Sequence, residues 1–155
     1  MSRTGLRTIL FDFFGTLVDY NPSRTGQGFP ETHRIIGEMG GHLSYEEFVA
    51  VWDRTFSEYE RRTALDDREF SMTDVATSVL AAAVDRPVRA DEIEALIEVY
   101  LAEWSAGVRY LDDVAPLLAD LSGDYRLGVL TNTHSAGLVP GHLAAMGSLR
   151  SSPPW

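Results

Sequence analysis

The stretch Ile9-Leu10-Phe11-Asp12-Phe13-Phe14-Gly15-Thr16-Leu17-Val18-Asp19 decides the fold of this chain. It begins as an apolar run, and residues 6–11 have the pattern of a central parallel strand that is buried on both faces. The strand ends on Asp12, and Gly15 breaks the run. A carboxylate at the end of a buried strand costs free energy unless it is paired or used. Ligands of open α/β sheets bind at the carboxyl ends of the strands, so Asp12 is the first candidate functional residue.

Composition limits the classes of partner. The 155 residues suit one domain, or a core with a small insert, and 45% apolar content can bury a core. A net charge of −10 argues against nucleic acid and anionic membranes as partners. A small anionic substrate stays open, because a cation or local arginines can reverse the field in a pocket. All thirteen basic residues are arginines.

The compartment is predicted from what the sequence lacks. There is no cysteine, which excludes disulfides and thiolate metal sites. No apolar run approaches the roughly 20 residues of a membrane span. The first five residues do not have the anatomy of a signal peptide, so a cytoplasmic location is expected.

Residues 21–106 are predicted to form an all-helical unit, because their apolar side chains recur at helical spacing after a loop rich in Gly, Pro and Ser. Four helices are expected in this unit. The first should begin at Pro30 and the third near Thr73, whereas capping boxes mark the start of the second, with Ser44 and Glu47, and of the fourth, with Asp91 and Glu94. The second helix should end near Arg62, and Gly107 is the expected C-cap of the fourth.

The remaining chain returns to alternating elements. A short helix is expected within residues 111–121, a second buried strand over 126–130, and a helix from about 135 or 138 to 146. This order predicts an α/β core, discontinuous over 1–20 and 107–147, with an inserted all-α cap over 21–106. Residues 148–155 are expected to be an irregular tail.

The two predicted strands should bring Asp12, Thr16, Thr131 and Asn132 to one edge of the sheet. This combination suits nucleophilic catalysis by a carboxylate. Asp12 would form an ester with the substrate, hydroxyl and amide donors would hold developing charge, and water would hydrolyse the ester. The histidines show no metal-ligand spacing and are expected at surface or capping positions: His33, His42, His134 and His142.

These motifs resemble the haloacid dehalogenase superfamily across about residues 5–147. Its first motif, Asp-x-Asp-Gly-Thr-Leu after an apolar strand, is matched by residues 12–17, Asp-Phe-Phe-Gly-Thr-Leu. Its second, an apolar strand ending in Ser or Thr and often followed by Asn, is matched by residues 127–132. The resemblance implies a Rossmann-like α/β core with an inserted helical cap of the C1 type, and a hydrolase.

The resemblance also implies roles for individual residues. Asp12 would be the nucleophile and, in phosphate-handling members, a magnesium ligand together with the backbone carbonyl of Phe14. Thr16 would orient the first loop, and Thr131 and Asn132 would contact the transferred group. The substrate-binding residues implied in this way are Phe14, Gly15 and Arg54.

Phe14 leaves two substrate classes open. Phosphatases of the superfamily usually carry a second Asp at this position, and phenylalanine cannot transfer a proton, a function worth roughly 10²–10⁴-fold in rate. The dehalogenase branch has an aromatic residue there and needs no metal. The substrate is therefore either a small phosphorylated metabolite, with Mg²⁺, or a 2-haloacid, with no cofactor. The candidates for a cap arginine that takes up halide or carboxylate are Arg34, Arg54, Arg61 and Arg62.

The superfamily's third and fourth motifs, a Lys or Arg and an acidic pair, have no counterpart after Asn132, and no Asp or Glu follows Asp124. The core is therefore expected to be incomplete and the chain truncated after the second motif. A two-stranded sheet leaves apolar edges open, through which self-association is expected. The alternative to the hydrolase is a catalytically inactive fragment or binding module.

Overall fold

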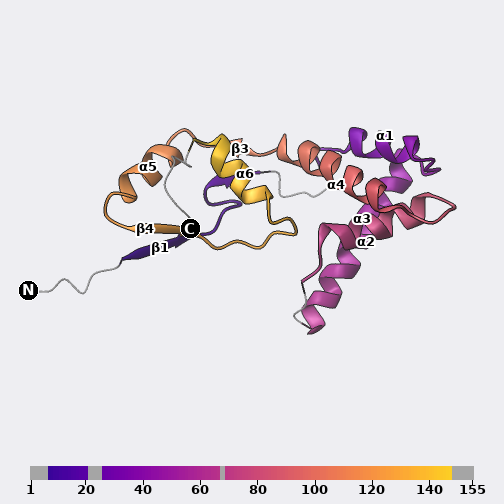
Figure 1. Ribbon diagram of the computed structural model, residues 1–155, viewed down its shortest axis with the longest axis horizontal. Coiled ribbons are helices and arrows are strands. Elements are labelled where there is room, and N and C mark those ends of the chain that lie inside the picture. Colours follow the sequence, from indigo (N-terminus) through magenta and orange to yellow (C-terminus); the bar gives the residue numbers. More distant parts are fainter. Residues whose placement is uncertain (1–6, 21–25, 67–68, 148–155) are drawn as a thin grey trace, which may run out of the picture. The chain divides into compact units, whose positions relative to one another are not determined.

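A computed structural model describes residues 7–20, 26–66 and 69–147, and it shows a mixed α/β protein that is mostly helical with little sheet (Figure 1). The chain divides into two units. The first, the sheet unit, contains the described residues up to Tyr20 and those from Val108 on, and the second, the helical unit, contains the described residues between them. Within the described ranges, no helix is both long and apolar enough to cross a membrane.

The sheet unit is built on one parallel pair of strands. Strand β1 (Thr8–Phe11) pairs with β4 (Arg126–Val129) in the register Thr8↔Arg126 to Phe11↔Val129. Helices α5 (Val114–Leu121) and α6 (Leu138–Ala145) flank β4 in the sequence. Their apolar faces form one core with the turn after β1, and the buried members are Phe13, Leu17, Val18, Val114, Leu118, Val139 and Leu143.

The prediction of strands buried on both faces is wrong. Ile9 and Phe11 are half-buried, but Thr8 is exposed and the side chain of Leu10 is 62% exposed. Leu130, directly after β4, is 72% exposed. The described part of this sheet has two strands with a core on one face, so alternate residues point to solvent.

A second ladder joins the points where the chain leaves and re-enters the sheet unit. Strand β2 (Val18–Asp19) pairs antiparallel with β3 (Arg109–Tyr110), and the side chains of Asp19 and Arg109 form an ion pair. The sequence did not predict these strands, because two residues are too few to show a period.

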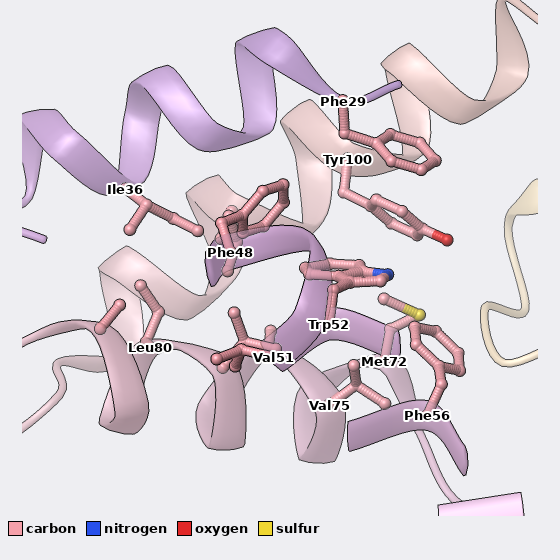
Figure 2. Packing of buried hydrophobic residues seen from close by; sticks show 14 of the residues in the cluster. Phe29, Ile36, Phe48, Val51, Trp52, Phe56, Met72, Val75, Leu80 and Tyr100 are labelled. Carbon is pink, nitrogen blue, oxygen red and sulfur yellow. The ribbon is translucent and has the colours of Figure 1, made fainter. Parts of the chain in front are cut away.

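The helical unit contains the four predicted helices, α1 (Pro30–Glu38), α2 (Tyr45–Asp66), α3 (Met72–Ala83) and α4 (Ala90–Ser105). Figure 2 shows Trp52 at the centre of their core, with its ring centroid 4.4 Å from that of Tyr100 and 5.6 Å from that of Phe48. Aromatic rings at these separations add to the free energy of burial. The Trp52 side chain is fully buried, and its indole N–H has no hydrogen-bond partner in the described part of the chain.

The helix starts match the predictions in part. The capping box of Ser44 and Glu47 is confirmed, with the Ser44 N–H 2.8 Å from the Glu47 carboxylate and the Glu47 N–H 3.3 Å from the Ser44 hydroxyl. Helix α2 continues past Arg62 to Asp66. The box of Asp91 and Glu94 is wrong. The carboxylate of Glu92 instead accepts the backbone N–H of Arg89, 3.1 Å away.

The start of α1 is capped from another helix. Its N-cap residue, Phe29, has no side chain that can accept a hydrogen bond. The carboxylate of Glu103 on α4 accepts the backbone N–H groups of Glu31 and Thr32, both at 2.9 Å, and the Thr32 hydroxyl at 2.7 Å. Thr32 is fully buried, so this carboxylate satisfies donors that water does not reach.

Gly107 is not the C-cap of α4, which ends at the cap residue Ala106. A Cβ atom on Gly107 would lie 2.0 Å from Oε1 of Gln27. The amide nitrogen of Gln27 donates to the carbonyl oxygens of Glu103, at 3.0 Å, and Trp104, at 3.3 Å. Glycine at this position therefore makes room for a side chain that binds the last carbonyl groups of α4.

Candidate functional site

The ends of β1 and β4 define the candidate site. Their last paired residues are Phe11 and Val129, and the N–H of Leu130 donates to the carbonyl oxygen of Phe11 at 2.8 Å. Because the strands are parallel, the segments that follow β1 and β4 leave the sheet at the same edge. Asp12 directly follows β1 at this edge, and Thr131 and Asn132 follow β4 after one intervening residue.

Asp12 presents an accessible carboxylate. Its side chain is exposed, so the expected cost of a buried carboxylate does not arise. Oδ1 accepts the N–H of Phe13 at 2.8 Å, the one hydrogen bond that this side chain makes with described residues. The second oxygen, Oδ2, has no described partner. One carboxylate oxygen is thus anchored to the backbone, and the other is accessible for binding or attack.

A tight turn holds Asp12 in place. The carbonyl oxygen of Phe13 accepts the N–H groups of residues 16, 17 and 18 at 2.8–3.3 Å, and the N–H of Gly15 donates to the carbonyl oxygen of Val18 at 2.8 Å. Gly15 has φ +80°, which L-residues with a side chain rarely adopt. Phe13 and Leu17 are buried on the core side of this turn, whereas Thr16 is exposed.

The ring of Phe14 belongs to an aromatic cluster behind the turn. It meets the rings of Phe13 and Tyr20 edge-on, with centroids 4.9 and 5.7 Å away. The imidazole of His142, from α6, lies 6.0 Å from the Phe13 centroid and 6.2 Å from that of Phe14. Phe14 therefore packs beside the carboxylate and offers it no proton.

His142 is the site residue that the sequence analysis missed. It is 5% exposed, so the prediction of a surface or capping role is wrong for this histidine. Its Nδ1 is 2.9 Å from the hydroxyl of Tyr110, and burial lowers the pKa of the imidazole below its ordinary value. A sequence signal existed, because His142 shares the inward spacing of the apolar residues 139, 143 and 146.

The loop after β4 carries the other predicted residues. Thr131 is half-buried, Asn132 is exposed, and neither side chain hydrogen-bonds a described residue. The hydroxyl of Thr133 lies 3.3 Å from both the N–H and the carbonyl oxygen of Ser135, and so fixes the turn before α6. The hydroxyl of Thr131 and the amide of Asn132 are the polar groups that this loop supplies near the sheet edge.

The arginine candidates differ in their partners. Arg34 pairs with acidic residues of its own helix, and Arg61 and Arg62 both pair with Glu58. Arg54 is exposed on α2 and makes no ion pair with a described residue. Of the four candidates, Arg54 is the one whose guanidinium is not already neutralised by a described neighbour. Its substrate-binding role stays a prediction.

The magnesium hypothesis rests on few ligands. The expected donors are the Asp12 carboxylate and the carbonyl oxygen of Phe14. The described ranges contain no cluster of three or more His, Asp or Glu that could hold a metal ion. Mg²⁺ binds through one or two carboxylates together with waters and substrate phosphates. These two donors do not complete a metal site by themselves, and a bound ion would depend on oxygens of a phosphorylated substrate.

No protein-family model matches the chain, and no curated protein matches it significantly.

Proposed function

We propose that this chain is a hydrolase of the haloacid dehalogenase type, acting through an aspartyl ester on Asp12. The observation that carries the proposal is the placement of Asp12 at the end of β1, beside the end of β4 that bears Thr131 and Asn132. The anchoring of Oδ1 by the Phe13 N–H supports it, because a fixed carboxylate with one accessible oxygen is oriented for attack.

The reaction proceeds in two steps. Oδ2 of Asp12 attacks the carbon that bears the halogen, the C–O bond forms, and the halide leaves with the bonding electron pair. Water then adds to the ester carbonyl carbon of Asp12, and the bond from this carbon to Oδ2 breaks, so that Oδ2 leaves as the hydroxyl oxygen of the product. The products are a 2-hydroxyacid, a halide ion and a proton, and the Asp12 carboxylate is restored. Thr131 and Asn132 donate hydrogen bonds to the bound substrate.

Phe14 favours a halide over an alkoxide as leaving group. Cleavage of a phosphate ester releases an alkoxide that must be protonated, and the ring of Phe14 has no proton to give. A halide leaves without protonation. The phosphorylated substrate is the second candidate. It would need Mg²⁺ bound by the Asp12 carboxylate, the Phe14 carbonyl oxygen and the substrate phosphate.

Two assays of the purified chain test the proposal. Halide release from 2-chloropropionate is measured with a chelator present, and phosphate release from p-nitrophenyl phosphate is measured with Mg²⁺. Asp12→Asn should abolish the activity, whereas Asp124→Asn, at an exposed turn of the same unit, should leave it unchanged. Phosphate release alone would favour the phosphatase. Turnover that survives Asp12→Asn, or no turnover of either substrate, would contradict the hydrolase and favour an inactive binding module.

Isotope labelling tests the ester itself. With enzyme in excess over 2-chloropropionate in H₂¹⁸O, the first turnover should release a product that carries ¹⁶O from Asp12. Mass spectrometry of the peptide with residues 8–24 should then show ¹⁸O in the carboxylate. Label in the first product instead would mean that water attacks the substrate directly.

A further inference from the structure

One face of the β1–β4 pair is an apolar strip open to solvent. Leu10 and Leu130 are 62% and 72% exposed, and the alternation along the strands puts both on the face opposite the core. Gly128, the partner of Leu10 in the register, leaves room between them. A Cβ on Gly128 would lie only 2.8 Å from Cδ2 of Leu10, so the leucine lies flat across the neighbouring strand.

The two ends of this strip carry opposite charges. Arg126 begins β4 on the same face as Leu10, because it lies two residues before Gly128; its side chain is exposed and forms no ion pair with a described residue. Asp12 lies at the other end, also exposed and without a cationic partner in the described ranges. Along the strand direction, the strip therefore runs from Arg126, through Leu10, to Asp12 with Leu130 beside it.

This order of charges is complementary to itself. Arg126 precedes Gly128 by two residues and Asp12 follows Leu10 by two, so each charge lies about 7 Å from the centre of the strip at about 3.3 Å per residue. A two-fold axis at that centre, across the strands, would place a second strip antiparallel on the first. Leu10 of one copy would then meet Leu10 of the other, and Arg126 of one copy would lie level with Asp12 and Leu130 of the other.

We propose that a second copy of this chain covers the open face, forming a two-fold dimer with antiparallel strands. The distribution of charge supports this occupant. Residues 1–20 and 108–155 together carry five Arg and six Asp, a net charge of −1. Residues 21–107 carry eight Arg and seventeen Asp or Glu, a net charge of −9. Two copies can therefore approach through the sheet unit with little repulsion, whereas contacts through the helical unit are opposed.

Sedimentation equilibrium of the full chain over a wide range of concentrations tests the proposal. A monomer–dimer equilibrium is expected. Leu10→Gln should raise the dissociation constant at least about a hundredfold, because each dimer loses two apolar side chains from its interface. Leu65→Gln, at an 83% exposed leucine of α2, is the matched control and should leave the constant unchanged. Circular dichroism checks that each variant folds. If Leu10→Gln does not fold, Leu130→Gln is tested in its place.

A charge reversal tests the antiparallel arrangement. Arg126→Asp should weaken the dimer, and Asp12→Arg added to it should restore the affinity. A monomer at every concentration, growth beyond the dimer, or equal effects of Leu10→Gln and Leu65→Gln would overturn the proposal. If the double variant dimerises as weakly as Arg126→Asp alone, the antiparallel pairing is overturned. These measurements use no turnover, so they stand or fall independently of the hydrolase.

Discussion

Replacing Glu103 by alanine removes the acceptor of three hydrogen bonds at the start of α1. The backbone N–H and hydroxyl of Thr32 are 2.9 and 2.7 Å from the Glu103 carboxylate, and Thr32 is fully buried. An N-cap is worth about 0.5–2 kcal/mol, and a hydrogen bond to a charged group about 1.5–3 kcal/mol. These terms overlap, so we expect Glu103→Ala to lower the free energy of unfolding by about 3 kcal/mol.

Urea unfolding, followed by tryptophan fluorescence, measures this loss, because Trp52 is at the centre of the helical core. Glu98→Ala is the matched control. Glu98 is exposed on the same helix, so the two substitutions share the change in helix propensity and differ in the cap. A double-mutant cycle of Glu103→Ala with Thr32→Val should show coupling. If the free energies of unfolding of Glu103→Ala and Glu98→Ala differ by less than about 0.5 kcal/mol, the cap is not stabilising α1.

Two further predictions follow from the packing. Burial lowers the pKa of His142 below its ordinary 6.5, so the unfolded chain binds a proton more readily, and stability should fall as pH drops below about 6.5. His142→Gln should flatten this slope in urea unfolding at several pH values, whereas His42→Gln, at an exposed position, should not. Gly107→Ala should lower the free energy of unfolding by about 1 kcal/mol, because the side chain of Gln27 would move and lose its hydrogen bonds to the end of α4. That cost should disappear in a Gln27→Ala background, measured by thermal unfolding.

Local patterns in the sequence predicted most of the helices. Side chains at helical spacing and the reciprocal bonds of Ser44 and Glu47 act within one or two turns, so the residues that decide them are neighbours in the chain. The pairing of the two longer strands was also predictable, because the chain order puts Asp12 and Thr131 after strands of one α/β core. The roles proposed for these two residues in the chemistry stay predictions.

The tertiary structure decided the features that depend on residues far apart in the chain. Glu103 caps a helix that begins about seventy positions earlier, and no local rule connects the two. Gly107 is needed for the side chain of Gln27 and not for its own backbone conformation. Leu10 lies in an apolar run that resembles a buried strand, yet it is 62% exposed because burial depends on what covers the second face.

The stretch from Ile9 to Asp19 shows both what the sequence determines and what only the tertiary structure decides. Its sequence alone determined a strand, a glycine turn and a carboxylate between them, because strand propensity and the positive φ of Gly15 are local properties. Only the tertiary structure placed Phe14 in a cluster with His142 and left one oxygen of Asp12 exposed. Packing between distant segments sets these surroundings, because burial and contact depend on neighbours in space rather than in the chain.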